Sequence, residues 1–164
     1  MTVMPSASFH HMTDADLNNI AAYIRSHVPG DGPELEVTAG PVARFLIWNG
    51  VFQPQAESVL EEAPWLVEAD RQSGLGTGRY VALTACGECH GLDLEGSEGF
   101  SPGLAIAVAY TREDFHRLMR EGKPVGDREL NLMRDMSLRR FSHFTDEEID
   151  ALFAYLQTLA SEST

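Results

Sequence analysis

Five consecutive residues, Cys86-Gly87-Glu88-Cys89-His90, bring two thiols and an imidazole together within one turn of chain. The Cys-x-x-Cys-His pattern is typical of covalent haem attachment. In such sites both sulfurs form thioethers to the haem vinyl groups, and the adjacent imidazole is the proximal iron ligand. Cys86 and Cys89 are the only cysteines of the chain. The motif therefore predicts one haem, covalently bound through Cys86 and Cys89, with His90 on the iron.

Three other chemistries use similar residues. A thiol–disulfide redox protein carries its Cys-x-x-Cys beside a βαβ pattern, whereas the patterns of this chain are nearly all helical. A structural zinc site needs four ligands, and two cysteines with one histidine lack a well-placed fourth. A haem-based sensor stays an alternative function for the motif, whereas a haem enzyme would keep an open iron position. Met133 and Met136 instead favour a closed, six-coordinate iron, which suits an electron carrier.

Length, composition and charge reduce the range of possible functions further. The 164 residues, 43% of them hydrophobic, suffice for one ordinary domain with a core, or for a small domain with an attachment. A net charge of -13 argues against nucleic-acid binding and suits a basic or neutral docking partner, although it also serves solubility alone. No apolar stretch approaches the roughly 18 residues that cross a bilayer, so we expect no transmembrane segment in this chain.

Two segments repeat each other at one constant offset, residues 4–24 and residues 136–156. Each copy predicts a helix: a threonine N-cap, acids in the first turn, then apolar residues at helical spacing. In the second copy, Thr145 and Glu148 suit a capping box. The residues that match between the two copies are Met4 and Met136, Phe9 and Phe141, His11 and His143, Thr13-Asp14 and Thr145-Asp146, and Tyr23 and Tyr155. So many matches at one offset within one chain indicate an internal repeat.

About residues 76–162 resemble a class I cytochrome c domain. The features that match are the Gly78-Arg79-Tyr80 segment, Cys86 to His90, Pro102, a distal methionine and the helix opened by Thr145-Asp146-Glu147-Glu148. The chain is similar in particular to tandem-haem (di-haem) cytochrome c proteins and to cytochrome subunits of alcohol or sugar dehydrogenases. The resemblance implies an all-α fold: a helical domain around one covalent haem c, plus an N-terminal helical extension. It also implies an electron carrier rather than an enzyme.

The resemblance assigns roles to individual residues. The second ring nitrogen of His90 donates to a proline carbonyl, here Pro102. The sixth ligand is predicted to be Met133, because the Leu132-Met133 sequence resembles the second domain of tandem-haem relatives. Met136 is the alternative, because the repeat aligns it with Met4. The first and last helices of the family cross at a glycine, a role that Gly78 matches, with Tyr80 and Tyr155 as the aromatic residues.

Other residues of the C-terminal half carry further expectations. Thr111 predicts the start of a helix that ends at Gly122 and Pro124, with Met119 on its apolar face and His116 solvated. Residues 123–144 are expected to be mostly irregular. Arginines flank this methionine segment as exposed charges or as partners of a haem propionate; they are Arg128, Arg134, Arg139 and Arg140.

The repeat suggests a division of the chain into three parts. The second copy follows a haem motif and the first follows none. We therefore interpret residues 1–29 as the C-terminal loop and helix of a preceding, truncated cytochrome c domain; an independent capping helix is the other interpretation. Residues 30–75 are predicted to be a connector with short helices over 42–48 and 55–62. Residues 76–164 are the predicted cytochrome c domain.

The resemblance also implies partners and a location. The partners are redox proteins: a dehydrogenase as electron donor and an oxidase or another cytochrome as acceptor. Covalent haem attachment in such proteins takes place after export, so we expect a periplasmic or otherwise extracytoplasmic protein. The first 17 residues are polar and lack the apolar segment of a signal peptide. We therefore expect a signal upstream of this sequence, or a longer chain that contains it.

Overall fold

The computed structural model describes residues 6–30, 32, 39–50, 59 and 75–162. The chain divides into two compact units, Met1–Leu66 and Val67–Thr164. Within the described ranges every regular element is helical, and a single isolated β-bridge joins Ser97 and Ser101. The all-α prediction is confirmed. None of the helices in these ranges is long and apolar enough to cross a membrane.

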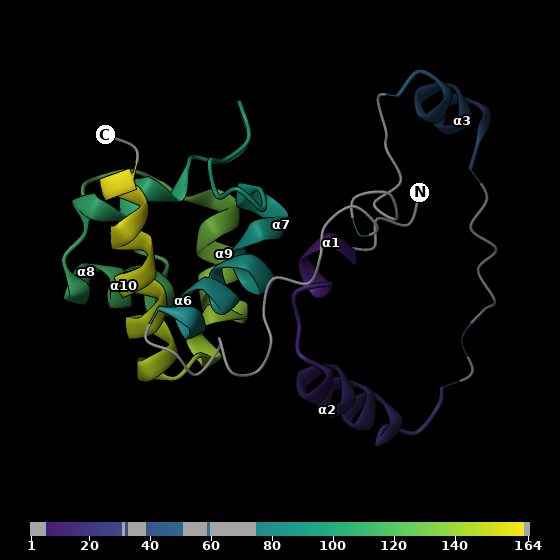
Figure 1. The fold of residues 1–164 in the computed structure, drawn as a ribbon, viewed down its shortest axis with the longest axis horizontal. Helices are drawn as coiled ribbons and strands as arrows, with labels where there is room; N and C mark the ends of the chain where they lie inside the picture. Colours follow the sequence, from purple (N-terminus) through teal and green to yellow (C-terminus); the bar gives the residue numbers. More distant parts are fainter. Residues whose placement is uncertain (1–5, 31, 33–38, 51–58, 60–74, 163–164) are drawn as a thin grey trace. The chain divides into compact units, whose positions relative to one another are not determined.

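The N-terminal unit contains three described helices, drawn in purple and blue in Figure 1: α1 (Ser6–Phe9), α2 (Asp14–Arg25) and α3 (Pro41–Trp48). The Thr13 hydroxyl accepts a hydrogen bond from the Asp16 N–H, 3.2 Å away, and so caps α2. Pro41 occupies the first turn of α3, where its missing N–H costs nothing. The helices expected from Thr13 and over 42–48 are present, and the one expected over 55–62 lies outside the described residues.

The apolar side of α2 is open to solvent. No residue of this helix is buried, and Leu17 and Ile24 are 42% and 64% exposed. An amphipathic helix normally covers its apolar stripe against a core. The sequence of α2 is therefore typical of a helix that packs its apolar side against a core, but no described residue buries that side.

The C-terminal unit is an array of helices coloured teal to yellow in Figure 1. A helical segment runs from Gly76 to His90 as α6 (Gly76–Val81), a π-helical turn η1 (Ala82–Cys86) and α7 (Gly87–His90). The remaining elements are the 3-10 helix η2 (Leu104–Ala109), α8 (Arg112–Glu121), α9 (Asn131–Arg139), the short 3-10 helix η3 (Phe141–His143) and α10 (Asp146–Glu162).

Helix α10 supplies the largest part of the core. Its Ile149, Leu152 and Leu156 are at most 2% exposed. They join a cluster with Phe115 and Met119 of α8, among others. The N–H of Thr145 donates to Glu148 Oε2 at 2.8 Å, and the N–H of Glu148 donates to Thr145 Oγ1 at 3.2 Å. The predicted capping box is present, so two backbone donors at the start of α10 are satisfied.

Helices α6 and α10 meet at Gly78. A Cβ added at Gly78 would lie 2.0 Å from the Ala151 carbonyl oxygen and 2.7 Å from Tyr155 Cβ. Only a glycine allows the two helices to approach this closely. The predicted crossing of the first and last helices at Gly78, beside Tyr155, is therefore confirmed.

Residues 123–144 are not mostly irregular, and that expectation was wrong. They contain α9 and η3, with Met133, Met136 and the fully buried Ser137 on α9. The N-cap of α9 is Leu130, which makes no side-chain capping bond. The usual start signal is absent, and a buried serine interrupts the apolar spacing. Helix α8 fits its expected bounds, with Thr111 as N-cap and Gly122 as a left-handed C-cap.

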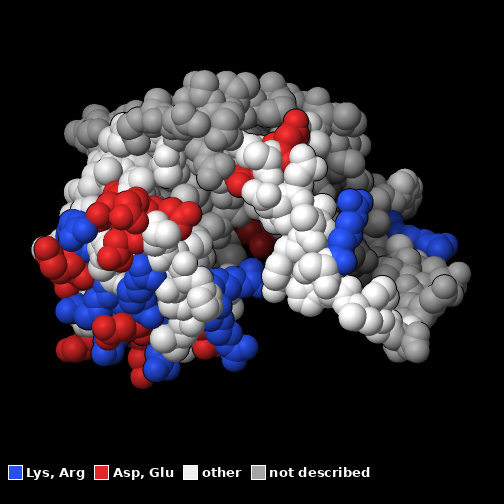
Figure 2. All heavy atoms as spheres, turned by 90° about the horizontal axis from the view of Figure 1, so that it is seen from below, with Lys and Arg blue, Asp and Glu red and all other residues white. Residues whose placement is uncertain are grey.

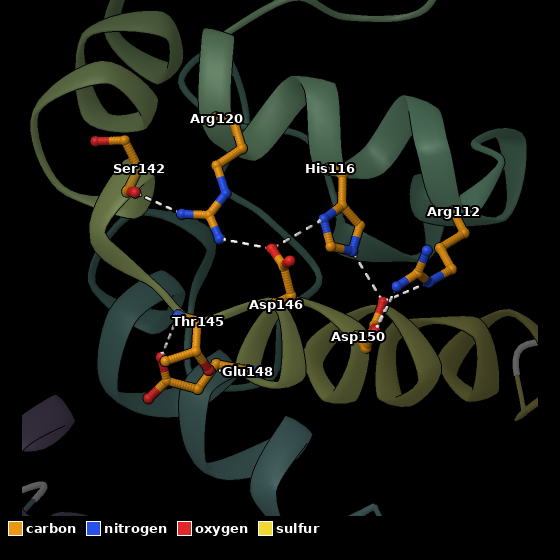
Figure 3. Close-up of polar contacts among 8 residues, drawn as sticks. All are labelled: Arg112, His116, Arg120, Ser142, Thr145, Asp146, Glu148 and Asp150. Atoms are coloured by element: carbon orange, nitrogen blue, oxygen red, sulfur yellow. Dashed lines mark hydrogen bonds and ion pairs between the residues drawn. The ribbon is translucent and has the colours of Figure 1, made fainter.

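An ionic cluster joins α8 to α10 (Figure 3). Arg112 binds Asp150 through two hydrogen bonds of 2.6 and 2.7 Å, and His116 Nε2 lies 2.8 Å from Asp150 Oδ1. Arg120 contacts Asp146 at 2.8 Å and also donates to the Ser142 carbonyl. The His116 side chain is only 18% exposed, so the expectation of a solvated His116 was wrong. Its partners, Asp146 and Asp150, lie at least thirty residues away in the sequence, so local sequence patterns cannot reveal them.

These contacts change the pKa of Asp150 in the cluster. Hydrogen bonds from Arg112 and His116 lower the pKa of Asp150 from 3.8 to about 2. On the face drawn in Figure 2, red and blue side chains are interspersed over the part of the chain on the left, which is the C-terminal unit. Side chains of opposite charge are thus mixed on this face of the unit.

Candidate functional site

The Cys-x-x-Cys-His residues lie at the end of the helical segment that begins at Gly76. The turn before them, η1, is π-helical, a widened turn that often occurs at functional sites. Cys86 is buried and joins the core cluster, whereas Cys89 and His90 are partly exposed. The local winding therefore places one thiol in the core and the other thiol, with the imidazole, at its edge.

Both thiols are held in their neutral form. Burial, followed by the neighbouring Cys89, raises the pKa of Cys86 to about 12. Burial and Glu88 also raise the pKa of Cys89, against a lowering by Arg140. A thiol–disulfide oxidoreductase works with a lowered thiol pKa. The environment of these cysteines is the opposite of the one that such an enzyme uses.

The imidazole of His90 is oriented by a backbone carbonyl. His90 Nδ1 lies 2.8 Å from the carbonyl oxygen of Pro102, and this is the hydrogen bond expected from the sequence. Because Nδ1 donates a hydrogen bond to the Pro102 carbonyl, the lone pair of Nε2 is free to bind a metal. Metal-ligating histidines are commonly oriented in this way.

A tight loop returns the chain from His90 to Pro102. Gly96 has a φ of +89°, and a Cβ there would lie 2.5 Å from the Pro102 carbonyl carbon. Its N–H donates to the His90 carbonyl at 2.8 Å, and the Ser101 hydroxyl donates to the Cys89 carbonyl. Gly96 and Ser101 therefore hold Pro102 against the motif. Neither residue was predicted from the sequence, although the glycine-rich composition of the loop was a usable signal.

Two methionines of α9 face the interior. Met133 and Met136 are partly buried and pack against the core cluster that contains Cys86. The Ser137 hydroxyl donates to the Met133 carbonyl at 2.9 Å. Met119, in contrast, is 1% exposed in the core, which confirms that it packs there. Both α9 thioethers thus stay candidates for the sixth ligand.

The donor set suits a haem better than a metal ion held by side chains alone. Within the described ranges, no three or more His, Cys, Asp or Glu side chains converge on one metal position. What the chain offers is two thiols one helical turn apart, an imidazole with Nε2 available, and two thioethers that pack against the same core cluster as Cys86. These groups match thioether attachment and axial ligation of a macrocycle.

A small all-helical domain with this donor set belongs to the class of haem-binding electron carriers. The sequence profile of the family described as cytochrome c matches residues 76–160. This match covers more than half of the chain, and the chain therefore belongs to the cytochrome c family. Proteins of this family transfer electrons by means of haem.

One curated relative extends along nearly the whole sequence. The chain is 21% identical over 184 aligned positions to the fructose dehydrogenase cytochrome subunit of Gluconobacter japonicus. The alignment covers 98% of this chain but only 37% of that subunit. The chain thus spans little more than a third of the relative's length.

Proposed function

We propose that this protein is a one-electron carrier with a single covalent haem c. In this proposal Cys86 and Cys89 form the two thioether links, His90 is the proximal ligand and Met133 is the distal ligand, with Met136 as the alternative. The observation that carries the proposal is the His90–Pro102 hydrogen bond of 2.8 Å, within the cytochrome c region and one turn from both thiols.

The protein's own residues have separate tasks in this function. The Pro102 carbonyl keeps the His90 ring in one tautomer and makes Nε2 a better ligand. The Met133 thioether, as a neutral ligand, would raise the reduction potential relative to a second histidine. Ile149, Leu152 and Met119 keep water out of the adjoining core. When bound, the haem iron alternates between its ferrous and ferric states.

Haem attachment is tested by mass and by extraction. The chain is produced with an export leader in a host that attaches haem c, then its intact mass is measured. We expect the mass of one haem above that of the polypeptide, and colour that stays with the protein in acidified acetone. Replacing both Cys86 and Cys89 by serine should give an extractable or absent haem. A colourless wild-type protein, or haem lost on extraction, would exclude the proposal.

The distal ligand is tested by three single substitutions. The ferric protein should show the weak far-red absorption band of methionine-ligated haem. We expect Met133→Ala to abolish this band and Met136→Ala to retain it. Met119→Leu is the control, because Met119 is buried in the core. Loss of the band only in Met136→Ala would move the assignment to Met136.

We also propose that residues 1–29 are the end of a preceding cytochrome c domain, that residues 30–75 are a connector and that residues 76–164 are the haem domain. The exposed apolar side of α2 supports this division, because its repeat partner α10 buries the matching side. Amide hydrogen exchange distinguishes the two helices: we expect fast exchange in α2 and slow exchange in α10. Equal protection in both would favour an independent capping helix.

The proposed partners follow from the relative. The chain would receive electrons from a dehydrogenase and pass them to an oxidase or another cytochrome, in the periplasm or another extracytoplasmic compartment. Its similarity to a dehydrogenase cytochrome subunit supports this place in electron transfer. Mixing the oxidised haem protein with a sugar dehydrogenase and its sugar should produce the reduced absorption spectrum. Fractionation of cells that express the complete gene would test the location.

A further inference from the structure

Ser101 joins the loop before Pro102 to the last turn of the Cys-x-x-Cys-His segment. Its half-buried hydroxyl donates a hydrogen bond to the Cys89 carbonyl oxygen and accepts one from the Ser97 N–H at 3.1 Å. The Cys89 carbonyl is one of the last four of helix α7, and such carbonyls have no partner within their own helix. Ser101 thus satisfies a backbone acceptor that α7 leaves open.

This hydrogen bond lies next to the one that orients the imidazole. His90 Nδ1 donates to the Pro102 carbonyl oxygen at 2.8 Å, so two successive residues of the motif are joined to two successive residues of the loop. The two bonds run in opposite directions, because the motif accepts in one and donates in the other. A single hydrogen bond lets its partners turn about the bond, whereas a second bond beside it fixes their relative orientation. Supporting bonds of this kind hold a metal ligand in its productive geometry.

Leu94 anchors the same loop to the core independently of Ser101. Its side chain is buried in the core cluster, and its carbonyl accepts the Leu104 N–H at 2.8 Å. Its φ of +61° is in the left-handed region, which no other non-glycine residue of the described ranges adopts. Strain of this kind persists only where the surroundings hold the backbone in place. Loss of the Ser101 hydroxyl should therefore leave the loop folded and change only the orientation of the Pro102 carbonyl.

We propose that Ser101 is a positioning residue that sets how strongly His90 donates electron density to the haem iron, and thereby the reduction potential. The proposal rests on the proposed electron-carrier function. A well-aligned hydrogen bond from Nδ1 to Pro102 makes the imidazole a more basic ligand. A more basic ligand stabilises ferric iron more than ferrous iron, so it lowers the reduction potential. Removal of the Ser101 hydroxyl weakens the hydrogen bond between His90 and Pro102 and therefore raises the potential.

A merely structural role for Ser101 predicts a shift of the opposite sign. If loss of the hydroxyl only loosened the loop, water would reach the haem more easily. A more polar environment stabilises the ferric haem, which carries one more positive charge than the ferrous haem, and so lowers the reduction potential. The direction of the shift therefore distinguishes a positioning role from a structural one.

The test compares matched variants of the haem-loaded full chain. Ser101→Thr keeps a hydroxyl, whereas Ser101→Val has nearly the same shape without one. Ser101→Ala removes the hydroxyl with the smallest change in size. Ser97→Ala is the control, because it makes the same chemical change in the same loop. The Ser97 side chain is exposed, and its hydroxyl makes no hydrogen bond within the part of the chain that the structure describes.

Haem content is measured first in every protein, followed by two quantities. A redox titration with one-electron mediators gives the equilibrium between ferric and ferrous protein; each haem gains or loses one electron, with no bond made or broken. Nuclear magnetic resonance of the nitrogen-15-labelled reduced protein gives the rate at which the His90 Nδ1 proton exchanges with water. This rate reports on the hydrogen bond to Pro102 independently of the potential.

We expect Ser101→Ala and Ser101→Val to shift the equilibrium about threefold toward ferrous protein, a rise of about 30 mV for a one-electron couple in which tenfold is about 59 mV. Exchange of the His90 Nδ1 proton should become about tenfold faster in the same two variants, because part of the net energy of one hydrogen bond is lost. Ser101→Thr and Ser97→Ala should match the wild type in both measurements.

Several results would overturn the proposal. One is a potential that is unchanged or lower in both variants without the hydroxyl, and another is an equal rise in Ser97→Ala. Failure of haem attachment in Ser101→Ala and Ser101→Val, with normal attachment in Ser101→Thr, would assign the hydroxyl to folding instead. A wild-type chain without haem would overturn the proposed function as well, whereas haem in every protein with equal potentials would overturn this proposal alone.

Discussion

Replacing Gly78 by alanine tests the contact that holds the first and last helices together. The added Cβ would lie 2.0 Å from the Ala151 carbonyl oxygen and 2.7 Å from Tyr155 Cβ. Because the first of these is a backbone atom, no side-chain rotation relieves the clash. Helices α6 and α10 would have to move apart by about 1 Å or more, which loosens the packing around Leu152 and Leu156.

The expected loss of stability combines two opposing effects. Overpacking of a core costs about 1–3 kcal/mol, and a backbone clash belongs at the upper end. Alanine in a helix gains about 1 kcal/mol over glycine. The net loss for Gly78→Ala is therefore about 2 kcal/mol. For a domain of this size it lowers Tm by about 8–16 °C.

Thermal unfolding of the haem-loaded protein, followed by far-ultraviolet circular dichroism, measures this change. Gly40→Ala is the control, because nothing lies within 4 Å of a Cβ added there, and its Tm should match that of the wild type. If Gly78→Ala unfolded at the wild-type temperature, the close approach of α6 and α10 at Gly78 would be refuted. A Tm above that of the wild type would mean that helix propensity alone governs the site.

Three further predictions follow from local contacts. Because the folded-state pKa of Asp150 is lowered to about 2, its contribution to stability is present above about pH 4 and is lost as the pH falls toward 2; acid titrations should show a smaller loss over this window in Asp150→Asn. Thr145→Ala removes the cap of α10 and should cost about 1 kcal/mol in denaturant unfolding, and no change would mean that the capping box is dispensable. Ile149→Ala should cost about 2–5 kcal/mol in the same assay, because Ile149 is fully buried. Leu17→Ala, at the matching position of the repeat, should cost less than about 1 kcal/mol because Leu17 is 42% exposed, and equal costs would contradict the exposure of α2.

The sequence by itself was sufficient for features that depend on neighbouring residues. Threonine caps predicted α2, α8 and α10, because the hydroxyl and the N–H it binds are only three residues apart. The apolar spacing in α10 predicted its buried stripe, since helical periodicity places those side chains on one side. The two thiols and the imidazole of Cys86, Cys89 and His90 stand in one turn, so their shared chemistry was also visible locally.

The tertiary structure decided the features that depend on distant residues. Helix α9 has no side-chain capping bond and carries a buried serine, so its helical state depends on packing rather than on local signals. The sequence predicts that His116 is a surface residue, but in the folded chain Asp146 and Asp150 of α10 lie next to its ring. The exposed apolar side of α2 and the buried one of α10 share a sequence pattern. Periodicity states which side of a helix is apolar, but only the assembled chain decides whether anything covers that side.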